Sequence, residues 1–301
     1  MKIFSRRRAV AVAALATAGL VGACTPPESG TPDPNVKSVS NAVFEWEISR
    51  EANNAAFAPG QFNWWNAGTA AATNDATYNN ATHGNATVLK KNASGTFVPI
   101  GSESAVSFAN RTKKGNGAAV TTGNSNFLDQ KVRYTAGTGK VNTATGVATI
   151  SWSGTFTINF YGIYVPFQVA NPKLTVDASG KGTLTATLSG IAKDQSDPEA
   201  PGVTLPKTNV TLAEVPNFYS SGSIATGASA AQPNYLGKVV TTHPDAAPQS
   251  ASGTAYHGSW PQNFVNFQNA TGLSSYWYSS GGAADALKVQ LPFSVNYSIA
   301  G

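Results

Sequence analysis

The segment that decides the fold is VATISWSGTFTINF, residues 147–160. From Ala148 to Phe160 the even positions carry apolar side chains, apart from Gly154, and the odd positions carry only Thr, Ser and Asn. A period of two is the period of a β-strand with one buried face. Gly154 indicates a bulge or the close approach of another backbone rather than a break. The segment therefore predicts one long strand.

Shorter alternating runs, separated by Gly and Asn, continue on both sides of this segment. Ser179-Gly180-Lys181-Gly182 is a hairpin turn between two of them. The chain is therefore predicted to be all-β, a layered antiparallel β-sandwich or flattened barrel. The other expected strands are 44–48, 131–134, 164–169, 173–177, 183–188, 209–215, 237–242 and 289–297.

One segment has a helical period. In SWPQNFVNFQNATG, residues 259–272, aromatic side chains recur at i, i+4 and i+7 from Trp260. Ser259 is a suitable N-cap and Gly272 follows the last apolar residue. The pattern predicts a short C-terminal amphipathic helix over 260–269, and its apolar face is expected to cover one end of the sheet layers.

The N-terminus has the three parts of an export signal: a basic start, an apolar run over 9–20, and small residues before Cys24. The run is too short to span a bilayer, which needs about 20 apolar residues. Val21-Gly22-Ala23-Cys24 resembles the bacterial lipobox, so we expect a signal peptide over 1–23 and a lipid on Cys24. The alternative is an ordinary secretory signal with a chance cysteine.

Ser5-Arg6-Arg7 also resembles a twin-arginine signal, which leaves the export route open. After Cys24 the chain is rich in Pro and polar residues, and we expect a disordered tether over 24–40 followed by one β domain over 41–301. The expected location is the outer face of the cell membrane. The membrane is then a partner through the lipid anchor.

The net charge of +5 belongs to the leader. Without its four basic residues, 16 Lys and Arg face 15 Asp and Glu, so the remaining net charge is +1 and no nucleic-acid partner is expected. Cys24 is the single cysteine, so the folded part is expected to have no disulfide and no cysteine metal site.

Motifs of the common enzyme classes are absent: no G-x-S-x-G, phosphate-binding loop, G-x-G-x-x-G or H-E-x-x-H occurs. Glu45 and Glu47 would share one strand face, as paired carboxylates of a glycosidase do, but an outward solvated position is the simpler interpretation. The acidic run at Asp194, Asp197 and Glu199 lacks the spacing of an EF-hand. We therefore expect no enzyme, no catalytic residue and no metal site.

Aromatic residues are the remaining signal. Tyr161 follows the long strand directly, and Tyr276-Trp277-Tyr278 follows the expected helix. Three adjacent aromatic side chains cannot all enter one core. Either one of them serves a surface or ligand site, or Trp277 packs inward while the two tyrosines cover the rim with solvated hydroxyls.

From residue 151 to 190 the chain resembles the HtaA domain, found in secreted and surface-anchored actinobacterial proteins of haem uptake. The match depends mainly on Asn171-Pro172 and on the spacing from there to Gly182. FEWEISREANN (44–54) resembles the opening tryptophan strand of the family. The segment 261–288 resembles its closing helix, aromatic pair and Gly-Asp element, and the whole resemblance extends from about Val43 to Tyr297.

The resemblance implies a layered antiparallel β domain that holds haem through a tyrosine after the opening strand, supported by a histidine after the long strand. In this chain those positions fall near Ala55 and on Tyr161, so the ligand pair does not carry over. Phenolate and neutral imidazole both bind ferric haem iron, which leaves Tyr161 and His257 as candidate ligands. Tyr276 and Tyr278 are the further candidate haem contacts.

Two functions remain. One is an exported lipoprotein that binds haem and passes it to a haem-transport system. The other is a non-catalytic surface or cell-wall interaction module that has lost haem, because a fold does not determine a function.

Overall fold

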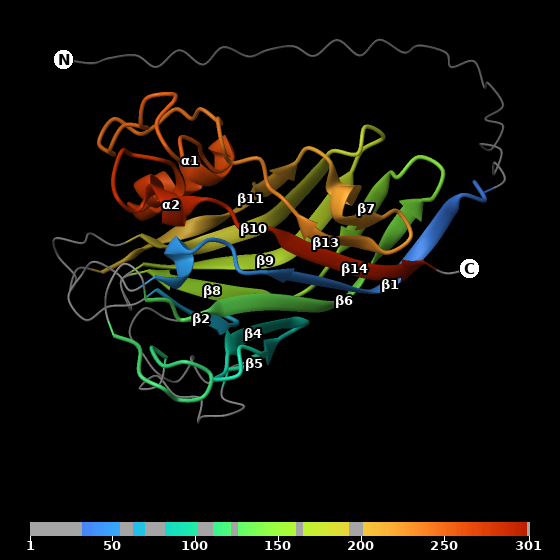
Figure 1. Cartoon of the computed structure of the whole chain (residues 1–301), viewed down its shortest axis with the longest axis horizontal. Coiled ribbons are helices and arrows are strands. Elements are labelled where there is room, and N and C mark those ends of the chain that lie inside the picture. Colours follow the sequence, from blue (N-terminus) through green and yellow to red (C-terminus); the bar gives the residue numbers. More distant parts are fainter. Residues whose placement is uncertain are drawn as a thin grey trace, which may run out of the picture. The chain divides into compact units, whose positions relative to one another are not determined.

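The fold is all-β and antiparallel, as the sequence predicts, and the strands form one large sheet (Figure 1). The computed structural model describes residues 32–54, 63–69, 82–100, 111–121, 126–160, 165–192 and 201–299. Within these residues the long path of the sheet is β11-β10-β9-β7-β6-β1-β14-β13-β12. The path does not return to its first strand, so the sheet is open.

The predicted long strand over 147–160 is two strands, β7 (Ala148–Ser151) and β8 (Thr155–Phe160). Both pair with β9 (Val165–Val176), which runs unbroken through Asn171, where two strands had been expected. The break falls at Gly154, which has φ 130° and an isolated bridge to Gly84. A Cβ at Gly154 would lie 2.6 Å from the carbonyl oxygen of His83, so the expected close backbone approach is present.

The sheet branches because its longest strands are shared. β6 (Gln130–Asn142) pairs with β1 along one side, and with β4 and then β7 along the other. β9 pairs with β8 and β7 in the same way, and β8 continues to β2. The other strands are β2 (Trp64–Ala67), β3 (Thr82–His83), β4 (Ala86–Lys91), β5 (Phe97–Pro99), β10 (Gly182–Ala192), β11 (Val203–Val215), β12 (Gly222–Ser223), β13 (Gly227–Ala231) and β14 (Phe293–Ile299).

The first strand begins earlier than the sequence indicated. β1 (Val36–Trp46) includes residues assigned to the tether, and it pairs with β6 from Val36 onward. Its first residues are mostly exposed, and they are held by the backbone ladder and by the buried side chain of Val39. β1 also pairs with β14, which makes the first and last strands neighbours. Cys24 and the leader lie outside the described residues.

Two other expectations need correction. Residues 237–242 form no strand, and Leu236 contributes only an isolated bridge to Gly258. Val240 is buried in the core while Val239 is exposed, so the segment packs on the core without joining the sheet. The last strand begins at Phe293 rather than at 289, after the short helix α2 (Asp285–Lys288).

The predicted helix is α1 (Gln262–Thr271), with Gly272 in the left-handed conformation as its C-cap. Its N-cap is Pro261 rather than Ser259, because the Ser259 hydroxyl donates to the carbonyl of Trp260 instead of to the helix. The expected apolar face is buried: Trp260, Phe264 and Phe267 all lie in the core. Among the described residues no helix is long and apolar enough to cross a membrane.

Candidate functional site

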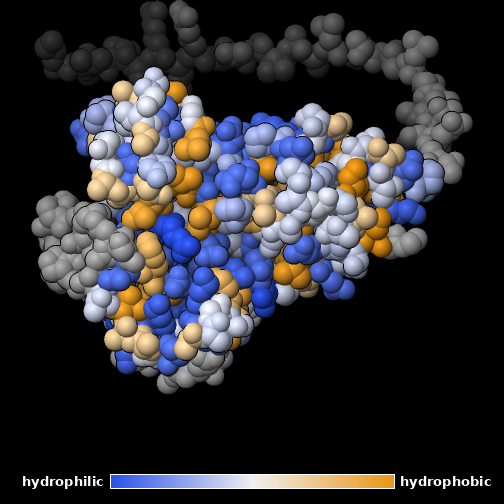
Figure 2. All heavy atoms as spheres, in the orientation of Figure 1, coloured by the Kyte–Doolittle hydropathy of each residue, from blue (hydrophilic) through white to orange (hydrophobic). Residues whose placement is uncertain are grey.

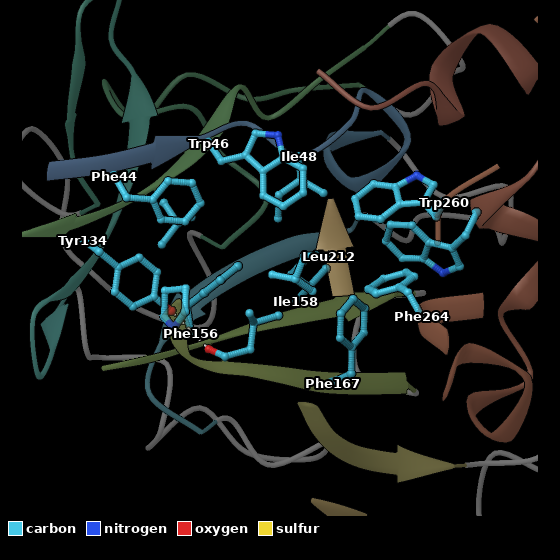
Figure 3. A pocket seen from close by; sticks show the side chains of 14 residues that line it. Phe44, Trp46, Ile48, Tyr134, Phe156, Ile158, Phe167, Leu212, Trp260 and Phe264 are labelled. Atoms are coloured by element: carbon cyan, nitrogen blue, oxygen red, sulfur yellow. Dashed lines mark hydrogen bonds between the residues drawn. The ribbon is translucent and has the colours of Figure 1, made fainter. Parts of the chain in front are cut away.

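An aromatic cluster fills the space between the sheet and α1 (Figure 3). Trp260 lies 4.7 Å from Phe264 and 4.8 Å from Trp277, measured between ring centroids, and 5.5 Å from Trp46 of β1. Phe167 and Phe160 join the same cluster through Trp277. Aromatic residues of the helix and of the strands thus meet in one packed core of rings.

The cavity inside this cluster is small. Its volume is about 10 Å³, and every side chain that lines it is apolar or aromatic. A single water needs at least about this volume together with polar partners, whereas small-molecule pockets span roughly 300 to 1,000 Å³. The cavity is therefore a packing void that holds no ligand in this conformation.

Tyr276 is the candidate that lies at a partly open aromatic surface. It is half-buried at η4 (Ser274–Trp277), and its ring centroid is 5.5 Å from that of Phe160, the last residue of β8. Phe160 is itself buried. Tyr161 follows Phe160 directly but lies outside the described residues. The structure thus places Tyr276 beside the strand end from which Tyr161 leaves.

Tyr278 does not occupy the solvated rim that the sequence suggested. Its side chain is fully buried, and its hydroxyl donates to the carbonyl oxygen of Ala247 at 2.6 Å. Burial raises the pKa of this phenol, which opposes the phenolate form that binds iron. Trp277 is buried as expected. Tyr278 is therefore a structural residue in this conformation.

His257 is partly exposed, but both of its ring nitrogens are buried without a hydrogen-bond partner. A short antiparallel pairing places Trp260 opposite Trp277 and Gly258 opposite Ser279. His257 precedes the bridge residue Ser259 and Tyr276 precedes its partner Tyr278, so on the two antiparallel segments they lie on opposite sides of the bridge. The structure does not bring these two candidates together.

A polar cluster that the sequence did not reveal surrounds the 3-10 turn η1 (Glu51–Asn53). The Asn53 side chain accepts from the backbone N–H of Gln130 at 2.7 Å and donates to the carbonyls of Glu47 and Gln130. The Gln130 side chain in turn binds the backbone N–H of Trp65 at 2.7 Å. The cluster consists of Glu51, Asn53, Asn54, Asn63 and Gln130, all buried.

Glu51 is the titratable member of this cluster. Burial raises the pKa of its carboxyl, while a hydrogen bond from Asn54 and the charge of Lys288 oppose that rise. Lys288 itself pairs with Asp285 at 2.9 Å, and both side chains are almost fully buried. The repeated Asn in EANN, residues 51–54, is the sequence signal for this cluster, but it does not show which strands the amides join.

Glu45 and Glu47 do not form a catalytic carboxylate pair. Glu45 pairs with Lys131 at 2.9 Å and with Arg133. Burial alone would raise the pKa of Glu45, but hydrogen bonds and charges from these two cations outweigh it and hold the pKa below its usual value. Glu45 is therefore a partly buried ion-pair partner rather than a simply solvated group.

The motif residues of the HtaA resemblance have structural roles. Asn171 adopts φ 51°, and its Oδ1 accepts the backbone N–H of Gly154 at 3.0 Å. The backbone N–H of Asn171 donates to the carbonyl of Gly154 at 2.9 Å. These bonds fix the offset between β7, β8 and β9, so this motif specifies the scaffold and not a ligand.

No metal-binding cluster of His, Cys, Asp or Glu is present within the residues that the structure describes. The acidic run from Asp194 to Glu199 lies outside them. His83 and His243 are on separate surface segments.

No family model and no curated protein matches this chain. Among solved structures, it is similar to the C-terminal domain of HtaA from Corynebacterium glutamicum, at 12% sequence identity and a TM-score of 0.41. The match covers 88% of this chain and 99% of that one. A likeness at this level transfers no site residue from one chain to the other.

Proposed function

We propose that this protein binds haem outside the cytoplasm, at the end of the sheet where β8 and η4 meet. The observation that supports the proposal is the contact between Phe160 and Tyr276, centroids 5.5 Å apart, immediately before Tyr161. A haem macrocycle is flat and apolar, so it can stack on the partly exposed Tyr276, which packs on the buried Phe160. Tyr161 is the proposed iron ligand, because a phenolate binds ferric iron.

The roles of the other candidates differ under this proposal. The half-exposed ring of Tyr276 supplies stacking area rather than a bond to iron. His257 and Tyr278 are both buried at their polar atoms, and either would have to leave its present position to reach a ligand. The lipid on Cys24 would keep the domain at the membrane, where bound haem passes to a transport system.

Hemin titration of the chain from residue 25 onward tests the proposal. We expect a shifted Soret band that saturates at one equivalent of hemin, and its loss in Tyr161→Phe. Tyr256→Phe is the matched control, because Tyr256 is an exposed tyrosine on a different loop. If wild type gives no shifted band, the haem proposal fails and the interaction module without haem remains.

A second variant separates stacking from ligation. Tyr276→Phe retains the ring and should bind hemin as wild type does, while Tyr276→Ala should weaken binding about tenfold, as expected for the loss of a stacked aromatic contact of about 1.5 kcal/mol. Equal binding by both variants would remove Tyr276 from the site. Membrane fractionation of Cys24→Ala tests the anchor independently: this variant should appear in the soluble fraction.

A further inference from the structure

A basic hairpin lies at the end of β4. It spans Arg111–Val120 and is closed by the bridge between Lys113 and Ala119 and by a hydrogen bond from Lys114 N–H to the Ala118 carbonyl at 2.9 Å. The turn is Gly115-Asn116-Gly117, in which the N–H of Gly117 donates back to Lys114. The hairpin therefore presents its lysines on a defined backbone.

The hairpin is fastened to β4 by a buried lysine. The ammonium of Lys90 donates to the carbonyls of Arg111 at 2.6 Å and Lys113 at 2.8 Å. Gly115 N–H donates to the Lys91 carbonyl at 3.3 Å. Because Lys90 is almost fully buried, it adds no charge to the surface. The surface charge comes from its neighbours.

Of the four partly exposed cations at this place, two pair with a carboxylate, that of Asp129. Asp129 lies 3.5 Å from Arg50 and 3.7 Å from Lys114. Lys91 and Lys113 pair with no carboxylate among the described residues. Four cations against one anion leave an excess of three positive charges. We name this group, Arg50, Lys91, Lys113, Lys114 and Asp129, the basic surface.

Aromatic rings hold two of these cations in place. Arg50 lies 5.4 Å from the ring centroid of Phe127, and Lys91 lies 5.2 Å from that of Phe97. Such contacts reduce the side-chain freedom that an anionic ligand would otherwise have to freeze. Figure 2 shows hydrophilic residues gathered over η1 and the adjoining part of β6, next to this hairpin. The surface is thus concentrated and partly preorganised.

The cations of the basic surface come from three segments of the chain. Arg50 lies just beyond the C-terminal end of β1, Lys91 is the last residue of β4, and Lys113 and Lys114 lie on the hairpin. Such a set of separate charges favours an anion that repeats along a chain over a single small anion.

We propose that the basic surface binds a linear polymer with repeated phosphate groups. Lysine ammonium groups bind phosphate as point charges, and Arg50 adds a planar fork for two phosphate oxygens. Several cations spaced over a hairpin and a strand end match a repeated anionic charge better than a single small anion. Binding adds no covalent step.

Inorganic polyphosphate is the probe, measured by titration against the chain from residue 25 onward at several salt concentrations. The double variant Lys113→Gln with Lys114→Gln should bind about tenfold more weakly, and the salt slope should fall by about two. Glutamine keeps the backbone bonds that these residues give the hairpin. Asp129→Asn removes the one carboxylate and should tighten binding.

The matched control is Lys140→Gln with Lys173→Gln, two exposed lysines on other strands, which changes the net charge equally. It should bind polyphosphate as wild type does. Equal weakening in both double variants, absence of binding at low salt, or equally strong binding to anionic phospholipid vesicles would each overturn the proposal. Hemin binding of the Lys113 and Lys114 variant should be unchanged, which separates this test from that of the haem site.

Discussion

The aromatic cluster beneath α1 and the polar cluster around η1 are neighbours at one end of the sheet, yet they are stabilised in opposite ways. Rings 4.7 to 5.8 Å apart fill the first and leave a void of about 10 Å³. In the second, Asn53 and Gln130 form hydrogen bonds with each other and with backbone groups of three segments. Removal of a ring leaves a cavity in the first cluster, whereas removal of an amide leaves buried polar groups without a partner in the second.

The largest expected effect is in the aromatic cluster. Trp260→Ala removes a ring that contacts Trp46, Phe264 and Trp277, and it should lower the free energy of unfolding by about 3 to 5 kcal/mol. Urea denaturation measures this loss. Val239→Ala, at an exposed position, should change stability by less than about 0.5 kcal/mol.

An intermediate effect is expected in the polar cluster. Asn53→Ala leaves the buried N–H and carbonyl of Gln130 without their partner and should cost about 2 to 3 kcal/mol. Asn234→Ala is the control, because that side chain is exposed. A loss as small as that of the control would show that water replaces the amide and that the network is not required.

The smallest effect concerns Lys90 and depends on pH. Burial lowers the pKa of Lys90 to about 7, below the value of a lysine in the unfolded chain. At a pH between the pKa of Lys90 in the folded chain and its pKa in the unfolded chain, the unfolded chain binds more protons. The free energy of unfolding should therefore rise with pH, by at most about 2 kcal/mol from pH 7 to about 9. Thermal unfolding across this range should show the rise in wild type and not in Lys90→Met. A rise that persists in the variant would assign it to another group.

The sequence predicted the parts of the fold that depend on periodicity. The strand and helix patterns around Ile150 and Phe264 follow from burial of one face, which a sequence displays directly. The prediction of one continuous strand over 147–160 was wrong, because Gly154 meets the backbone of residues 83–86, which are distant in the sequence. Residues 36–40 were missed because only Val39 among them is buried, which is too weak a hydrophobic signal next to the Pro-rich tether.

The candidate site was predicted less well. Tyr276 was singled out and is partly exposed. Adjacent aromatic letters do not show that Tyr278 is buried with its hydroxyl bonded to Ala247. The basic surface was also missed. Its cations come from three segments that are distant in the sequence and become neighbours in the sheet. Neither their order along the chain nor the small net charge shows that they gather on one surface.

The placement of β1 between β6 and β14 has a mechanical consequence. A force applied between Val36 and the far end of the sheet pulls β1 lengthwise, so the ladders on both of its sides resist together. A force applied between Val36 and Ile299, on adjacent antiparallel strands, would instead peel the pair apart one bond at a time. A domain tethered through its first strand and loaded at its opposite end is therefore stretched in its more resistant direction.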